Sequence, residues 1–159
     1  MSELKIKFAT SDDTSIVLEF IKKLADYEKL SHEVVATEEE LKKTIFAKNS
    51  NAEVILGYLG ETPVAFALFF HNYSTFLAKK GLYLEDLFVL PEYRRNGFGK
   101  IMLKFLAKLA LERNCGRFEW SVLDWNKPAI DFYKSIGAEQ KKEWLLNRLT
   151  GKSLIEFAK

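Results

Sequence analysis

Residues 83–100 read YLEDLFVLPEYRRNGFGK, and the rest of the chain is organised around this stretch. An apolar run ends at Pro91, a short basic loop follows, and Gly97 and Gly99 then open a helical pattern. A strand that leads through a glycine turn into a helix builds an anion site from backbone. The unpaired amides of the first helical turn point outward, and the helix dipole favours negative charge there. The sequence therefore predicts a phosphate-bearing ligand at residues 94–100.

Two arginines strengthen this hypothesis, because the guanidinium groups of Arg94 and Arg95 suit phosphate oxygens. The glycine pattern by itself is a weak signal. It matches neither the G-x-x-x-x-G-K-[ST] phosphate loop nor the G-x-G-x-x-G dinucleotide fingerprint. A solvated basic turn at the start of a helix is the alternative explanation for this stretch taken alone.

Outward from this stretch, apolar periodicity predicts an alternation of strands and helices. Strands are expected over 4–8, 53–59, 63–71, 82–90, 117–123 and 143–149. Helices are expected over 16–27, 37–46, 97–113, 128–136 and 150–157, with a loop over 72–81. Thr37 and Glu40 have the spacing of a capping box that opens the second helix. The predicted order is strand–helix–helix–strand–strand–strand–helix–strand–helix–strand, with a short final helix.

The composition suits one compact domain over residues 1–159, because 48% of the residues are hydrophobic and 14% are aromatic. The single cysteine, Cys115, allows no internal disulfide, which suits a reducing cytoplasm. The N-terminus has no signal-peptide core, and the longest apolar run, Val64 to Phe70, is too short to span a bilayer. We therefore expect a cytoplasmic protein with no membrane partner.

The charges are unevenly distributed along the chain. Residues 26–40 carry six acids and one base, whereas residues 89–117 carry seven bases and two acids. A basic segment suits a polyanionic cofactor and an acidic one a cationic substrate, although two solvated helix faces would give the same pattern. No signature of a nucleic-acid-binding module is present, so no nucleic-acid partner is expected. His32 and His71 match no metal-ligand spacing, so no metal is expected.

Two motifs resemble those of the GNAT acetyltransferases. Residues 89–99, VLPEYRRNGFG, resemble the family's acetyl-CoA motif V-x-P-x-x-R-x-x-G-x-G/A. Residues 125–138, WNKPAIDFYKSIGA, resemble its N-x-x-A-x-x-F-Y-x-x-x-G-F/A motif, in the family's order and at its usual separation. The resemblance spans essentially the whole chain and implies the GNAT fold, which is α/β (α+β). In that fold a mixed, mostly antiparallel sheet has helices on both faces, and its fourth and fifth strands splay apart.

The resemblance also implies acetyl-CoA as the cofactor. The implied cofactor-binding positions lie on the fourth strand, on the glycine loop and in the second motif: Leu87, Phe88, Val89, Arg94, Arg95, Asn96, Gly97, Phe98, Gly99, Lys100, Asn126, Ala129 and Tyr133. For Asn126, a role as N-cap of the following helix is equally plausible and compatible with cofactor contact.

Acetyl transfer from a thioester to an amine needs three groups. The amine must lose its proton, since an ammonium with a pKa of about 10 has no lone pair to attack with. The oxygen that gains negative charge needs a donor, for which the resemblance implies a backbone N–H within residues 87–89. The departing thiolate leaves more easily when an acid protonates it. The resemblance makes Tyr133 the candidate acid, and a core aromatic on an amphipathic helix is the alternative.

Glu85 is the candidate base, acting through water. Glu85 and Asp86 are neighbours in an otherwise apolar strand, so we expect them to point to opposite faces. Residues 83–89 resemble the L-Y-L-E-D-F-F-V of the spermidine/spermine acetyltransferases, where the glutamate lies at the substrate amine. A pair of carboxylates that only hold local structure is the alternative. Tyr27 and Glu28, in a segment that resembles the L-A-K-Y-E of the polyamine enzymes, join both acids as candidate substrate-binding residues.

The resemblance is closest to the spermidine/spermine (diamine) and thialysine acetyltransferase subgroup, as a bacterial-type member. It implies direct transfer of acetyl from acetyl-CoA to a primary amine of a small diamine, polyamine or lysine/thialysine-like substrate, by a homodimer. The segment between Gly137 and Trp144 is shorter than in the mammalian polyamine enzymes, which leaves polyamine specificity open. A peptide or protein N-acetyltransferase and a non-catalytic acyl-CoA-binding sensor are the alternatives.

Overall fold

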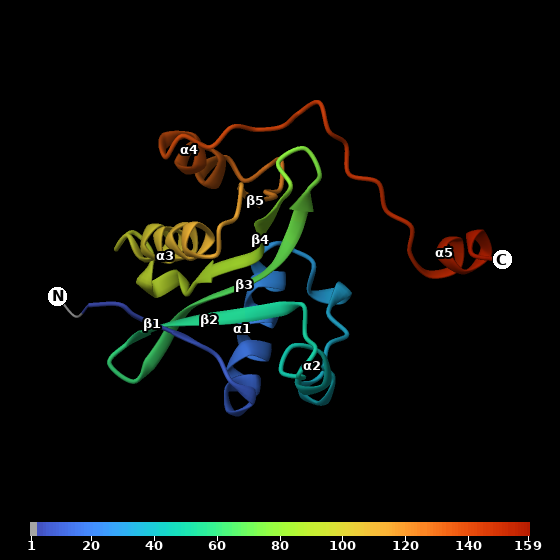
Figure 1. Ribbon diagram of the computed structural model, residues 1–159. Helices are drawn as coiled ribbons and strands as arrows, with labels where there is room; N and C mark the ends of the chain where they lie inside the picture. The colour runs from blue at the N-terminus through green and yellow to red at the C-terminus, as the bar shows by residue number, and fades with distance from the viewer. Residues whose placement is uncertain (1–2) are drawn as a thin grey trace. The chain divides into compact units, whose positions relative to one another are not determined.

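The computed structural model describes residues 3–159 (Figure 1). The chain divides into two units. The first unit ends at Ser121, and the second runs from Val122 to Lys159. The first unit contains a five-stranded sheet in the order β1-β2-β3-β4-β5. Its strands are β1 (Lys5–Phe8), β2 (Ala52–Leu59), β3 (Thr62–Ser74), β4 (Lys79–Val89) and β5 (Phe118–Trp120). All neighbouring pairs are antiparallel except β4 and β5, which confirms the expected mixed, mostly antiparallel sheet.

Helices cover both faces of this sheet, as the sequence predicts (Figure 1). The helices of the first unit are α1 (Thr14–Tyr27), α2 (Glu38–Thr44) and α3 (Phe98–Glu112), with 3-10 turns η1 (Ser11–Asp13), η2 (Ser31–Glu33) and η3 (Pro91–Tyr93). Side chains alternate along β2, so Val54 and Leu56 pack in the cluster around α1. On the other face, a Cβ added to Gly57 would come within 3.2 Å of the Met102 sulfur of α3.

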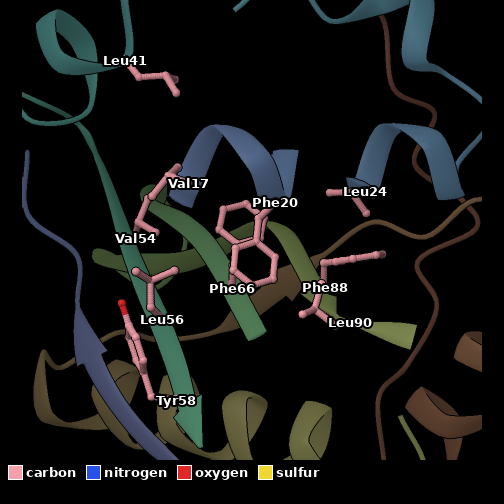
Figure 2. Close-up of a cluster of buried hydrophobic side chains, with 10 residues drawn as sticks. All are labelled: Val17, Phe20, Leu24, Leu41, Val54, Leu56, Tyr58, Phe66, Phe88 and Leu90. Carbon is pink, nitrogen blue, oxygen red and sulfur yellow. The ribbon is translucent and has the colours of Figure 1, made fainter. Parts of the chain in front are cut away.

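The core between α1, α2 and the sheet is a cluster of ten buried side chains: Val17, Phe20, Leu24, Leu41, Val54, Leu56, Tyr58, Phe66, Phe88 and Leu90 (Figure 2). Phe20 stacks on Phe66 at its centre, with ring centres 5.6 Å apart. Leu24 and Phe88 lie at one end of the cluster (Figure 2). Their burial fixes the C-terminal half of α1 against β4, which is where the candidate site begins.

The capping box predicted for the second helix is confirmed. The Glu40 amide donates to the Thr37 hydroxyl at 3.2 Å, and the Thr37 amide donates to the Glu40 carboxylate at 3.1 Å. The two orphan amides at the start of α2 are thereby satisfied.

The β3–β4 hairpin is longer than expected. The predicted loop over 72–81 is wrong at both ends, because strand pairing continues to Ser74 opposite Lys79. Polar residues at the end of a hairpin weaken the apolar alternation that a sequence pattern depends on, although backbone pairing continues through them.

Two irregularities in β4 shape the site. Leu68 of β3 pairs with Asp86 and Phe69 pairs with Leu84, so Glu85 is an extra residue, a β-bulge. Within the described part of the chain, β5 pairs with β4 only from Leu82 to Leu84. The second half of β4 therefore has no partner in β5, as expected for a fourth and fifth strand that separate.

The second unit contains α4 (Lys127–Ser135) and α5 (Gly151–Phe157), as predicted to within one residue at most boundaries. The predicted strand over 143–149 is wrong, since these residues form no strand. A strand needs a hydrogen-bonded neighbour, which an apolar run such as Trp144-Leu145-Leu146 cannot supply by itself. In residues 3–159, none of the helices is both long and apolar enough to cross a membrane.

Candidate active site

The loop between β4 and α3 has the conformation that an anion site needs. Gly97, the N-cap of α3, adopts a left-handed backbone with φ of 77°. The Ile101 amide donates to the Gly97 carbonyl at 3.0 Å, so the amides of residues 98–100 precede the hydrogen-bonded ladder of the helix. A Cβ added at Gly97 would meet no heavy atom within 4 Å, so open space adjoins the turn. These features fit the diphosphate of a CoA thioester.

The polar side chains of this loop have two different roles. Asn96 donates through Nδ2 to two carbonyl oxygens within the loop, at 3.0 and 3.2 Å, and stabilises the turn itself. Arg94 Nε donates to the Val89 carbonyl at 3.0 Å. Arg95 and Lys100 are exposed beside the helix N-terminus. The exposed cations therefore suit the phosphates of a ligand, whereas Asn96 and Arg94 hold the loop in place.

The second half of β4 presents backbone amides at an open edge. The Leu90 amide donates to the Val64 carbonyl of β3 at 2.9 Å. Strand alternation then directs the Phe88 amide to β3 as well, and the amides of Leu87 and Val89 to the opposite edge, beyond the end of β5. Amides at such an edge can donate to an oxygen that gains negative charge. Of the three backbone amides expected as donors to that oxygen, only those of Leu87 and Val89 point to this edge.

A pocket of about 440 Å³ lies between the C-terminal half of α1 and β4. Its apolar lining is Ile21, Leu24, Ala25, Leu30, Val34, Val35 and Ala36, and its acidic lining is Glu28, Glu33, Glu85 and Asp86. No basic side chain of the described residues lines it. Apolar walls suit a methylene chain and carboxylates suit an ammonium group, so the pocket fits a small cationic amine.

The bulge in β4 brings both strand carboxylates to this pocket. The expectation that Glu85 and Asp86 point to opposite faces was wrong, because it assumed a regular strand. An extra residue in a strand changes the alternation of side chains at that point. Glu85 is exposed and Asp86 is half-buried, and both line the same pocket as Glu28.

Burial, together with neighbouring negative charge, raises the pKa of two carboxylates in the pocket. Burial raises the pKa of Asp86 to about 7, with further contributions from the charges of Glu85 and Glu28. Burial also raises the pKa of Glu28, and the Glu85 charge adds to that shift. A carboxylate whose pKa lies near neutrality can take up a proton at physiological pH. Asp86 therefore joins Glu85 as a candidate base.

An arginine packs the α1 end of the pocket against the glycine loop. The Arg94 guanidinium carbon lies 4.5 Å from the centre of the Tyr27 ring and 5.1 Å from that of Phe88. The two ring centres are 6.2 Å apart. Of the four predicted substrate residues, Glu28, Glu85 and Asp86 line the pocket, whereas Tyr27 supports its wall.

The other residues predicted to bind the cofactor or to act as the acid belong to α4 and its N-cap, in the second unit. The Ala129 amide donates to the Asn126 side-chain oxygen at 3.4 Å, which confirms Asn126 as the N-cap of α4. Tyr133 is half-buried, and its ring centre lies 5.7 Å from that of Phe132. The cofactor contacts of Asn126 and Ala129, and the acid role of Tyr133, remain predictions.

Glu33 and the apolar segment around it also line the pocket, although no sequence motif predicted them there. The 3-10 turn η2 follows α1 after residues 28–30 and ends at Glu33, and residues 34–36 then complete the wall. The acid-rich composition of residues 26–40 was the available signal. That composition indicated a cationic ligand, but it did not show which acidic side chains would line the same pocket. The path of a loop depends on tertiary contacts, which leave no periodic pattern in the sequence.

Residues 20–138 match the model of the acetyltransferase (GNAT) family. The chain is 34% identical to a thialysine N-epsilon-acetyltransferase of Mus musculus, over 99% of both chains. It is 35% identical to an L-ornithine N5-acetyltransferase of Arabidopsis thaliana, over 94% of this chain and 86% of the relative. A spermidine/spermine N(1)-acetyltransferase-like protein of Homo sapiens is 29% identical over 99% of this chain, which spans 24% of that relative.

Solved structures share the fold. An integron cassette protein from the mobile metagenome of V. cholerae superposes with a TM-score of 0.83 at 29% identity, over 100% of this chain and 99% of that one. An aminoglycoside acetyltransferase from an uncultured soil sample superposes with a TM-score of 0.79 at 20% identity, over 94% and 97% of the two chains. The second likeness concerns the fold alone.

Proposed function

This chain belongs to the acetyltransferase (GNAT) family, and from that premise we propose that it acetylates a primary amine of a small diamine, polyamine or lysine/thialysine-like molecule. It is an N-acetyltransferase that uses acetyl-CoA as the acetyl donor. The observation that carries the proposed substrate class is the pocket at the end of α1, with four carboxylates in an otherwise apolar lining.

Among the proposed substrates, a basic amino acid with a side-chain amine has the strongest support. Two relatives of similar length are named for the side-chain nitrogen of thialysine and of L-ornithine. Both molecules combine a short chain with a terminal amine, which the apolar walls and the acids of the pocket can accommodate.

The pocket has two functions in this proposal. Its negative charge binds the amine as an ammonium ion. A carboxylate must then accept a proton, because only the neutral amine can attack. Glu85, acting through water, and Asp86, with a pKa near 7, are the two candidates for that step. The charge of Glu85 adds to the raised pKa of Asp86, because the two residues are neighbours in β4.

Bound acetyl-CoA supplies the thioester acyl group. We propose that the amides of residues 98–100, with Arg95 and Lys100, hold its phosphates. The Leu87 or Val89 amide would donate to the oxygen that gains negative charge. Tyr133 would donate a proton to the departing sulfur, as its place in the second motif suggests.

The test is thiol release from acetyl-CoA across a panel of amines: thialysine, ornithine, lysine, putrescine, spermidine and a lysine-rich peptide. The proposal expects kcat/KM for a free diamine or diamino acid to exceed that for the peptide by at least about tenfold, since the pocket volume of about 440 Å³ is that of a small-molecule site. Turnover of the peptide alone would contradict the proposal and favour protein acetylation. Tight CoA binding without turnover would favour a sensor.

Three further properties belong to the same proposal. The family match extends across the boundary between the two units, which supports one functional domain over residues 1–159. A single cysteine supports a cytoplasmic location. A homodimer follows from the subgroup that the sequence resembles, and sedimentation at micromolar concentration would test it.

A further inference from the structure

We infer that Arg94 is a positioning residue for the amine pocket rather than only a phosphate ligand of the cofactor loop. The inference rests on the proposed amine site. Arg94 belongs to the loop that leads into α3, yet its side chain is directed back to the elements that build the pocket. One side chain thus connects the two proposed binding sites.

The contacts of Arg94 fix it at two points. Nε donates to the carbonyl of Val89, the last residue of β4, at 3.0 Å. The guanidinium plane also lies near the rings of Tyr27 and Phe88, at 4.5 and 5.1 Å from their centres. A guanidinium over two adjacent aromatic rings is held by cation–π attraction, and its fork geometry permits a hydrogen bond at the same time.

The aromatic partners of Arg94 differ in how firmly the protein holds them. Phe88 is 4% exposed and belongs to the core cluster, so it is a fixed point. Tyr27 is 39% exposed, so the core covers only part of its ring. Arg94 therefore supplies part of the packing that keeps Tyr27, the last residue of α1, against β4.

The position of Tyr27 matters because Glu28 follows it directly. Glu28 is the C-cap of α1 and lines the pocket with Glu85 and Asp86. The chain turns sharply after it, with Lys29 at φ of 62°. Without Arg94, Tyr27 keeps its contact with the Phe88 ring but loses part of its packing. The last turn of α1 is then held less firmly, and the carboxylate of Glu28 with it.

The kinetic test compares four variants: Arg94→Met, Arg94→Lys, Tyr27→Leu and the double variant Arg94→Met/Tyr27→Leu. The KM for the amine is measured at saturating acetyl-CoA, and the KM for acetyl-CoA at saturating amine. We expect Arg94→Met to raise the KM for the amine about three- to tenfold. Arg94→Lys should recover part of the loss, because it keeps the cation. The double variant should be little worse than Tyr27→Leu alone, because both changes remove the same contact.

The matched control is Arg95→Met, which removes the neighbouring and exposed arginine. It should raise the KM for acetyl-CoA and leave the KM for the amine unchanged. An Arg94→Met variant with the same pattern as Arg95→Met would overturn the inference and make Arg94 a phosphate ligand alone.

A second measurement keeps the inference testable without turnover. Hydrogen exchange at the amides of residues 24–30 in the ligand-free protein should be faster in Arg94→Met than in the wild type, with unchanged exchange in β2. Equal exchange at residues 24–30 would contradict the inference. Absence of amine turnover in the wild type would instead contradict the proposed function, so the two failures are distinguishable.

Discussion

Asp86 is one of the two proposed bases of the pocket, and its protonation state changes near neutral pH. Its pKa of about 7 lies well above the ordinary value of 3.8, so Asp86 is largely protonated below pH 6 and ionised above pH 8. If Asp86 is the base, kcat/KM rises with pH and levels off above about pH 7. Asp86→Asn should remove this limb of the pH profile and lower kcat/KM by about 10²-fold.

The Glu85→Gln variant is the control that distinguishes Asp86 from Glu85 as the base. It removes a neighbouring negative charge that raises the pKa of Asp86, so it should shift the acid limb to lower pH and keep most of the plateau activity. A Glu85→Gln enzyme that is inactive at every pH would assign the base to Glu85, as the sequence first suggested.

Gly97 is the residue at which a substitution should weaken the binding of acetyl-CoA. Its φ of 77° lies in the left-handed region, where a β-branched side chain is strained by about 1–2 kcal/mol. Gly97→Val should therefore distort the turn and raise the KM for acetyl-CoA at least about tenfold.

Gly60→Val is the control for the Gly97 prediction. Gly60 also has a left-handed backbone, φ 59°, with no atom near an added Cβ, but it lies in the turn between β2 and β3. It should lose similar stability and keep normal acetyl-CoA binding. If both variants lose cofactor affinity equally, the anion site at the start of α3 is refuted.

At this scale the sequence predicted which residues gather but not how they are oriented. Glu28, Glu85 and Asp86 could be predicted as substrate-binding residues because the segments around them resemble those of the polyamine enzymes. The shared orientation of the two strand acids could not be foreseen, because a bulge depends on pairing with β3 and leaves no pattern in one strand. The contact between Arg94 and Tyr27 also depends on tertiary packing alone.

Among the elements, α2 is the helix whose stability should depend most on its N-terminal capping box. It is only seven residues long and buries one side chain, Leu41. Thr37→Ala removes a hydroxyl that accepts from the Glu40 amide and should lower the free energy of unfolding by about 1 kcal/mol, measured by urea denaturation.

Thr44→Ala is the control within the same helix. The Thr44 hydroxyl donates to the Glu40 carbonyl at 2.8 Å, but this bond competes with the helix rather than capping it. We expect a change of at most about 0.5 kcal/mol. Equal losses in both variants would show that the cap itself contributes nothing.

Elements with strong local signals were the ones the sequence placed well. The capping box of α2 and the apolar stripe of α3 lie within one segment and need no partner. The strand expected over 143–149 and the loop expected over 72–81 were wrong, because a strand is defined by its neighbour. Periodicity can suggest a strand but cannot supply that neighbour.

On the scale of the whole molecule, the residues proposed for the chemistry are divided between the two units. The carboxylates and the glycine loop belong to the first unit, and Tyr133 belongs to the second. If Tyr133 is the acid, Tyr133→Phe should lower kcat by about 10²-fold and leave the dissociation constant for acetyl-CoA within about twofold, measured by calorimetry. Wild-type kcat in Tyr133→Phe would remove this residue from the mechanism.

The family itself could be recognised from two short motifs, because they combine backbone requirements with side-chain chemistry. Gly97 is needed for a left-handed turn and Asn126 for a helix cap, and the structure has both. The pocket lies outside these motifs, between α1 and β4. Its shape depends on how the turn after α1 packs, which no motif encodes.

The cluster of carboxylates also favours turnover. With the proposed amine in the pocket, Glu28, Glu85 and Asp86 attract the positive charge of the substrate. Acetylation converts the reacting ammonium into a neutral amide, so the attraction to that nitrogen ends with the reaction. The product should dissociate faster than the substrate that preceded it, and weak product inhibition follows from the same charges that bring the substrate in.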